Sequence, residues 1–342
     1  ENKKIINIIV EEKPTGEIMA GAGVGTNGGT VAFGVSENNF LGRGIEFASD
    51  LTISGESLKG LISLNNPNYK GSNRSLNASL ESSVTDQLQK FGYKSTKTGF
   101  SLGSGFEIYD DLFWNTGISS YIEKLDTDSA VSSNIKKQEG TYFDTFFNQV
   151  FFYDKRNQRF KTSDGYFSRF NQNIPLISEN YTLTNGYDYK IYDEWLDENI
   201  FSFGLFLKAS NSINGKDIKL SERLFVPSNK LRGFEIGKVG PKDGTDYIGG
   251  NYAASINMAT TLPKILPNLQ NTSLSIFVDA ANIWGIDYDS AIGDGSKIRS
   301  SIGIAVDFFT PIGPLNFSLS EAITKGKNDI TETFRFNLGT TF

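Results

Sequence analysis

The stretch Ile298–Phe308, with the sequence IRSSIGIAVDF, alternates between two kinds of side chain. One phase is mainly apolar and consists of Ile298, Ser300, Ile302, Ile304, Val306 and Phe308. The other phase is mainly small or polar and consists of Arg299, Ser301, Gly303, Ala305 and Asp307. Successive side chains of a β-strand point to opposite faces, so this stretch predicts a strand with one apolar and one polar face.

The same period of two recurs outward from this stretch, whereas helical spacing is nearly absent. Clear examples are residues 273–280, 315–320 and 334–339, with noisier ones at 201–208 and 76–81. Turn signals separate the runs, as at Asn66-Pro67-Asn68 and Asp110-Asp111. Short connections alternate with long polar ones at 126–139, 212–249 and 283–296.

Two all-β architectures fit this pattern, a soluble β-sandwich and a transmembrane barrel. Many runs span about 9–11 residues, the length that a tilted strand needs to cross a bilayer. About 330 residues at about 21 per strand and connection give roughly 16 strands, an even number typical of bacterial barrels. The sequence therefore favours an all-β fold, a transmembrane antiparallel β-barrel of about 16 strands over residues 15–342, integral to the bacterial outer membrane.

Composition excludes several kinds of chemistry. The 342 residues include no His and no Cys, which removes histidine-based catalytic dyads and the usual ligands of zinc, haem and iron–sulfur clusters. The formal net charge of −6 argues against a general nucleic-acid binder. We therefore expect a protein that is not an enzyme, with no metal, no other cofactor and no nucleic-acid partner.

Three segments carry a family resemblance. They are Leu231-Arg232-Gly233-Phe234 with Val239-Gly240-Pro241-Lys242, the segment from Ser301 to Leu315 with its Pro311-Ile312-Gly313-Pro314 turn, and the terminal segment 334–342. Together they resemble the barrel domain of the BamA family of outer-membrane protein assembly factors. By this resemblance, residues 1–14 are the end of a preceding POTRA domain and its linker, and Asn39–Gly44 is the turn after the second strand.

The resemblance also implies a contact between a loop and the barrel wall. In the family, a long extracellular loop folds into the lumen, and its tip corresponds here to Arg232, Gly233 and Phe234. The matching wall carboxylate is Asp279, which the alternation independently places on the polar phase. The family's second acidic partner falls at Ala259, so either Asp279 pairs alone or another acid, such as Asp307, takes that place.

A weak seam between the first and last strands is the predicted functional feature. Glycine lowers strand stability, and Gly21, Gly23 and Gly25 share one phase of the first strand, expected over about 16–27. The predicted partner strand, about 330–342, contributes Phe336, Leu338, Gly339 and Phe342. The blander interpretation is that these glycines only allow close packing against the folded-in loop.

The resemblance implies an insertase that folds and inserts β-barrel proteins through this lateral gate. Its implied partners are unfolded outer-membrane β-barrel proteins, accessory assembly lipoproteins and outer-membrane lipids. The alternative is a passive or two-partner-secretion pore of the same superfamily. Gly23–Gly28 also spells G-x-G-x-x-G, but no helical pattern follows it, so we expect no dinucleotide site. Asp287, Asp289 and Asp294 lack EF-hand spacing, so we expect a solvated loop there.

Overall fold

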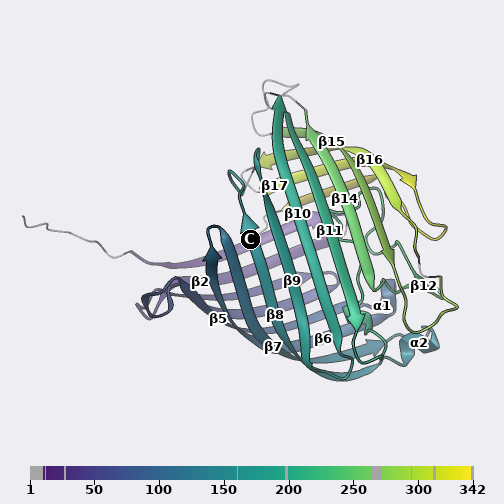
Figure 1. Cartoon of the computed structure of the whole chain (residues 1–342), viewed down its shortest axis with the longest axis horizontal. Coiled ribbons are helices and arrows are strands. Elements are labelled where there is room, and N and C mark those ends of the chain that lie inside the picture. Colours follow the sequence, from purple (N-terminus) through teal and green to yellow (C-terminus); the bar gives the residue numbers. More distant parts are fainter. Residues whose placement is uncertain are drawn as a thin grey trace, which may run out of the picture.

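The chain closes into one antiparallel β-barrel. The computed structural model describes residues 11, 13–26, 28–159, 161–196, 199–262, 272–293, 295–310 and 313–339. Within these ranges, sixteen strands form the closed ring β1-β18-β17-β16-β15-β14-β11-β10-β9-β8-β7-β6-β5-β4-β3-β2. Figure 1 shows the strands running obliquely around the barrel. The predicted barrel of about 16 strands is confirmed, and the sandwich is excluded.

The elements follow in chain order. The first half of the barrel contains β1 Gly16–Gly25, β2 Gly28–Phe40, β3 Ile45–Ser54, β4 Ser57–Asn66, β5 Arg74–Gln87, β6 Tyr93–Tyr109, β7 Leu112–Thr127 and β8 Gly140–Asp154. The second half contains β9 Gly165–Ile177, β10 Thr182–Leu196, β11 Asn199–Ser212, β14 Tyr252–Thr261, β15 Thr272–Trp284, β16 Arg299–Thr310, β17 Gly313–Thr324 and β18 Phe334–Gly339. The loops hold helices α1 Leu88–Phe91 and α2 Ser133–Lys136, 3-10 turns Tyr69–Gly71 and Leu220–Glu222, and a ribbon of β12 Lys242–Asp243 and β13 Asp246–Tyr247.

The barrel is apolar outside and more polar inside. On β16, Ile302 and Ile304 are 44% and 43% exposed, whereas Ser301 and Ala305 are 0% and 3% exposed. This reverses the polarity of a soluble protein and matches a wall that faces lipid. Among the described residues, no helix is both long and apolar enough to cross a membrane.

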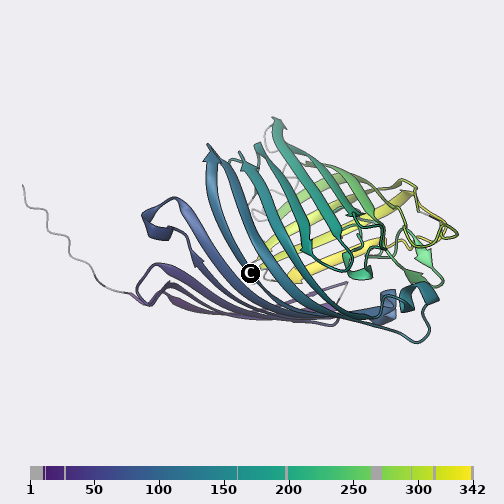
Figure 2. The same cartoon turned by 60° about the horizontal axis from the view of Figure 1, so that its bottom comes forward.

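The wall is uneven in height. β1 has ten residues, whereas β6 has 17. Several strands thus exceed the 9–11 residues that the sequence predicts. The start of β6, at Tyr93, and the end of β7, near Leu125, pack among loop residues. Figure 2 shows the long loops gathered at one end of the barrel, which we call the loop end.

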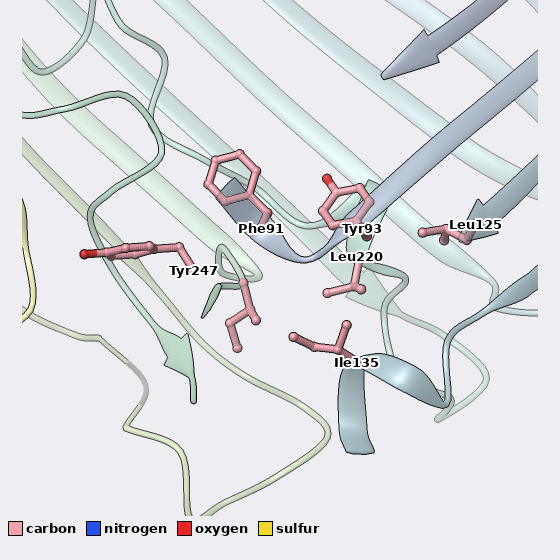
Figure 3. Close-up of a cluster of buried hydrophobic side chains, with 7 residues drawn as sticks. Phe91, Tyr93, Leu125, Ile135, Leu220 and Tyr247 are labelled. Carbon is pink, nitrogen blue, oxygen red and sulfur yellow. The ribbon is translucent and has the colours of Figure 1, made fainter. Parts of the chain in front are cut away.

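A small apolar cluster covers the loop end. Its members come from loops and strand ends and are Phe91, Tyr93, Leu125, Ile135, Leu220, Tyr247 and Ile248. Figure 3 shows α1 and α2 presenting Phe91 and Ile135 toward this cluster. Loop segments far apart in sequence therefore share one core and close over the lumen.

Predicted turns are present at two places in the barrel. The chain turns between β2 and β3 and at Asp110-Asp111, as predicted. Residues 1–10 and 12 lie outside the described residues, so the predicted boundary at residue 14 is not tested. Within Gly23–Gly28, β1 ends at Gly25 and β2 begins at Gly28, and none of the described residues of this stretch is helical.

Candidate functional site

The connection between β11 and β14, residues 213–251, enters the barrel and reaches the wall at Arg232. The Arg232 Nε atom donates to Asp279 Oδ2 at 2.7 Å, and Nη2 donates to Asp279 Oδ1 at 2.8 Å. The Arg232 backbone N–H also donates to Asp279 Oδ2, at 3.0 Å. This is a bidentate arginine–carboxylate pair, reinforced by the backbone.

Two wall residues complete this contact and were missed by the sequence analysis. The Arg232 guanidinium lies over the Phe277 ring, 3.3 Å from its centroid, and Asn257 Nδ2 donates to Asp279 Oδ1 at 2.8 Å. Phe277 could have been found, because it lies two residues before Asp279 on the same face. Asn257 faces Asp279 in the neighbouring strand, which only the strand register reveals.

The two positions considered for a second acidic partner of Arg232, Ala259 and Asp307, have other neighbours. Ala259 lies one inward position beyond Asn257 on β14, opposite Phe277. Asp307 accepts a hydrogen bond from Asn316 Nδ2 at 2.5 Å, on the β16–β17 ladder. The amide of Asn257 thus contacts Asp279 without adding a second negative charge.

Gly233 and Phe234 of the loop tip pack against the inner face of the barrel wall. Gly233 has a φ of 86°, and an added Cβ would lie 3.0 Å from the Ser301 Cβ, so this position requires glycine. Ser301 Oγ donates to the Arg232 carbonyl at 2.5 Å. Phe234 is 2% exposed and packs in a cluster that includes Ala281 and Ile283 of the wall.

A second polar anchor attaches the same loop to a different part of the wall. Lys219 is 1% exposed, and its Nζ lies 2.5 Å from Asp144 Oδ2 and 3.3 Å from both Glu123 Oε2 and Glu222 Oε1. Ser221 Oγ also donates to Glu123 Oε2, at 3.0 Å. Nothing in the alternation singled out Lys219, because it lies in the loop. Its two partners in the wall, Glu123 and Asp144, are on β7 and β8.

Burial and neighbouring charges shift the pKa values of the two loop groups in this anchor. Burial acts to lower the pKa of Lys219, but the carboxylates of Glu222, Glu123 and Asp144 outweigh it and raise that pKa. Burial raises the pKa of Glu222, although Lys219 opposes this shift. Lys219 is therefore a permanent cation facing more than one carboxylate.

The predicted seam is formed by β1 and β18. Within the described residues, three positions are paired: Gly23 with Gly339, Val24 with Leu338, and Gly25 with Asn337. The Thr26 N–H adds a bond to the Phe336 carbonyl at 3.1 Å. By contrast, ten positions pair β1 with β2. Gly21, Gly23 and Gly25 all lie on the inward phase of β1.

Close backbone approach explains one seam glycine. A Cβ added to Gly25 would lie 2.8 Å from the Phe336 carbonyl oxygen and would also collide with the Asn337 side chain. Phe336 stacks on Phe317 and Phe334, along the outward face. Phe342 lies outside the described residues.

The acidic loop between β15 and β16 has protein partners. Asp287 accepts a hydrogen bond from the Ile218 N–H at 2.8 Å and forms an ion pair with Arg223. Asp289 accepts one from Asn134 Nδ2 at 3.1 Å. Asp294 lies outside the described residues. Asp287 and Asp289 thus join this loop to its neighbours.

Comparison with known proteins agrees with this architecture. The chain is 24% identical over 349 residues to the outer membrane protein assembly factor BamA of Neorickettsia risticii, covering 99% of this chain and 46% of that protein. The chain thus spans about half the length of this curated relative. Its fold matches the crystal structure of Haemophilus ducreyi BamA lacking POTRA domains 1–3, with a TM-score of 0.89, 24% identity and coverage of 97% and 71%.

A second solved structure is less similar. CdiB from Acinetobacter baumannii has a TM-score of 0.58 and 13% identity, covering 94% of this chain and 59% of that chain. The polarity of the barrel and the match to outer-membrane relatives identify an integral outer-membrane protein. The Omp85 superfamily domain model matches residues 39–342, and the chain therefore belongs to the Omp85 superfamily.

Proposed function

We propose that this barrel assists the folding and insertion of other β-barrel proteins into the outer membrane by opening between β1 and β18. The observation that carries the proposal is the glycine-containing seam, in which Gly23 pairs with Gly339 and a Cβ added to Gly25 would collide with the Phe336 carbonyl oxygen. The similarity to BamA supports the same function.

The mechanism needs no covalent chemistry. When β18 leaves β1, the N–H and C=O groups along that edge lose their partners, which is costly in lipid. The terminal strand of an unfolded client can satisfy these groups by adding itself to the edge. Further client strands then pair in turn until the client closes and departs. Accessory lipoproteins and the surrounding lipids are the other proposed partners.

A reversible crosslink across the seam tests this function. The bond from Thr26 to Phe336 makes Gly23 and Gly339 a non-hydrogen-bonded pair, whose Cα atoms are typically about 4.5 Å apart, within disulfide range. The chain has no native Cys, so Gly23→Cys with Gly339→Cys gives one defined disulfide. In cells whose only copy is this variant, we expect oxidation to stop insertion of other barrel proteins and reduction to restore it.

The control crosslink joins strands that need not part. Ser79 and Ser101 face each other on β5 and β6, with Oγ atoms 2.7 Å apart, so Ser79→Cys with Ser101→Cys should crosslink without affecting insertion. Undiminished insertion with the seam crosslink verified would contradict the gate. If that variant also conducts ions, the passive or secretion pore becomes the better interpretation.

A further inference from the structure

The residues that precede β18 pair with the luminal loop instead of extending the strand. The alternation predicts a strand from about residue 330, whereas β18 begins at Phe334. The Glu235 N–H donates to the Ile330 carbonyl and the Ile330 N–H donates to the Lys238 carbonyl, both at 3.0 Å. The Glu332 N–H donates to the Gly233 carbonyl at 3.1 Å. The loop tip therefore holds the chain at the entrance to the last strand.

Arg335 carries this attachment into β18 itself. Its side chain is buried, with Nη1 donating to the Ser228 carbonyl at 2.8 Å and Nη2 donating to the Phe234 carbonyl at 2.5 Å. Its Nε donates to Glu332 Oε2 at 2.8 Å. The planar guanidinium thus bridges two loop carbonyls and one carboxylate, an arrangement that a lysine ammonium cannot reproduce.

The seam starts at the next residue. The Phe336 carbonyl accepts the Thr26 N–H, and Asn337 pairs with Gly25. The position of Arg335 therefore decides where the Phe336 carbonyl is presented to β1. Because the Phe336 carbonyl accepts the bond from Thr26, a displacement of Phe336 moves the start of β18 relative to β1.

We propose that Arg335 is a positioning residue that couples the luminal loop to the seam. The loop carbonyls hold the guanidinium, the guanidinium holds the start of β18, and β18 then meets β1 in the closed register. When Arg335 is released from the loop, the seam loosens, beginning at the loop end of the barrel. The relevance of this coupling to protein assembly rests on the proposed function, whereas the coupling itself concerns only the barrel.

Amide exchange at Thr26 tests the coupling directly. Arg335→Lys keeps the positive charge but loses the planar arrangement of guanidinium donors, and Arg335→Ala removes both the charge and the donors. We expect the Thr26 amide to exchange about tenfold faster in either variant, because a charge-assisted hydrogen bond of ordinary strength is lost. Amides in the β6–β7 ladder should exchange at their original rate. The measurement is hydrogen–deuterium exchange by NMR on the complete protein in lipid nanodiscs.

The matched control is Arg156→Lys. Arg156 also forms a two-pronged pair, with both Asp154 carboxylate oxygens at 2.8 Å, but it lies between β8 and β9. This variant should leave Thr26 exchange unchanged. Should Arg335→Ala fail to fold, Arg335→Lys decides. Unchanged Thr26 exchange in folded Arg335→Lys would overturn the proposal, as would an equal acceleration at Thr26 and in the β6–β7 ladder.

A third arm separates this inference from the proposed function. In Arg335→Lys, the oxidised Gly23→Cys and Gly339→Cys pair should restore slow exchange at Thr26, since the disulfide replaces the lost positioning. Faster Thr26 exchange in Arg335→Lys, with normal insertion of other barrel proteins in cells, would support the coupling while counting against the gate.

Discussion

At the scale of single residues, Asp279 has no exposed surface and receives hydrogen bonds from both the loop and the wall. Its carboxylate is stable there because Arg232 supplies a full positive charge and Asn257 supplies a further donor. The alternation placed Asp279 on the inward face. Which donors surround it depends on the path of the loop, and no local pattern encodes that path.

Asp279→Asn should therefore weaken the barrel. The substitution leaves the Arg232 guanidinium without its charge partner in a mostly buried place, and we expect a loss of about 3 kcal/mol in the free energy of unfolding. Urea titration of the folded fraction in detergent measures this loss. The control is Asp193→Asn, since Asp193 is exposed and accepts from Trp195. Equal stability of the two variants would contradict this account of the anchor.

Gly25→Ala should disturb the seam. The new methyl group collides with the Phe336 carbonyl and the Asn337 side chain, so β18 must shift away from β1. We expect the seam to open more often, which would be measured as faster amide exchange at Thr26. Gly29→Ala is the matched control, because the nearest atom to its added Cβ is the Gly23 carbonyl oxygen at an ordinary 3.8 Å. Similar exchange in both variants would disprove the steric explanation.

At the scale of elements, the loop 213–251 is a brace across the lumen. Lys219 ties its first part to β7 and β8, and Arg232 ties its tip to β15. Between these parts of the wall lie β14, β11, β10 and β9. The loop is thus attached at two separated places, which restricts its movement more than either ion pair alone.

Lys219→Met should cost about 3 kcal/mol at neutral pH, because several carboxylates then lack their shared cation. The loss should shrink as the pH falls. Lys219 opposes the burial-driven rise in the pKa of Glu222, so removing this cation should raise that pKa further in the variant. As the pH falls toward that pKa, the folded variant binds more protons than its unfolded state and gains more stability than the native protein does. The measurement is urea stability at pH 7 and pH 5.

Lys59→Met is the control for this prediction. Lys59 pairs with Glu81 at 3.1 Å, but its side chain is 46% exposed, so the pair contributes little. We expect a small change in stability that is the same at both pH values. A Lys219→Met deficit that stayed constant from pH 7 to pH 5 would show that lost packing, and not uncompensated charge, causes it.

At the scale of the whole molecule, the loop and the apolar cluster at the loop end occupy the lumen. A polar cavity of about 550 Å³ remains beside the loop, lined by residues such as Lys97, Asn148, Lys208 and Glu222. Leu220 and Tyr247 of this loop belong to the apolar cluster at the loop end (Figure 3). We therefore expect the loop to obstruct the lumen as well as to brace the wall.

Replacing residues 225–248 with a short Gly/Ser linker should open the barrel. We expect single-channel conductance in planar bilayers to rise severalfold, because the loop tip and the cluster members Tyr247 and Ile248 are removed. A heat-modifiability gel checks that the barrel still folds. The control shortens the loop 128–131, which leaves the Arg232 anchor in place. A folded deletion variant with native conductance would disprove the obstruction.

Periodicity together with the length of the alternating runs was sufficient for the barrel, the approximate strand number and the inward phase of Asp279. This is because a strand's two faces meet different solvents, and that difference is written locally in every second residue. Closure of a barrel then requires its first and last strands to pair. Family resemblance supplied Arg232–Phe234 as the loop tip, since a motif can be read without knowing its surroundings.

Only the tertiary structure decided which groups meet inside the lumen. The register of neighbouring strands and the path of one long loop bring four residues to their separate partners: Asn257, Phe277, Lys219 and Arg335. The same path decided where β18 begins, because the loop backbone takes the hydrogen bonds that would have lengthened the strand. Contacts between segments so distant in sequence depend on closure of the whole barrel, which no short stretch of residues encodes.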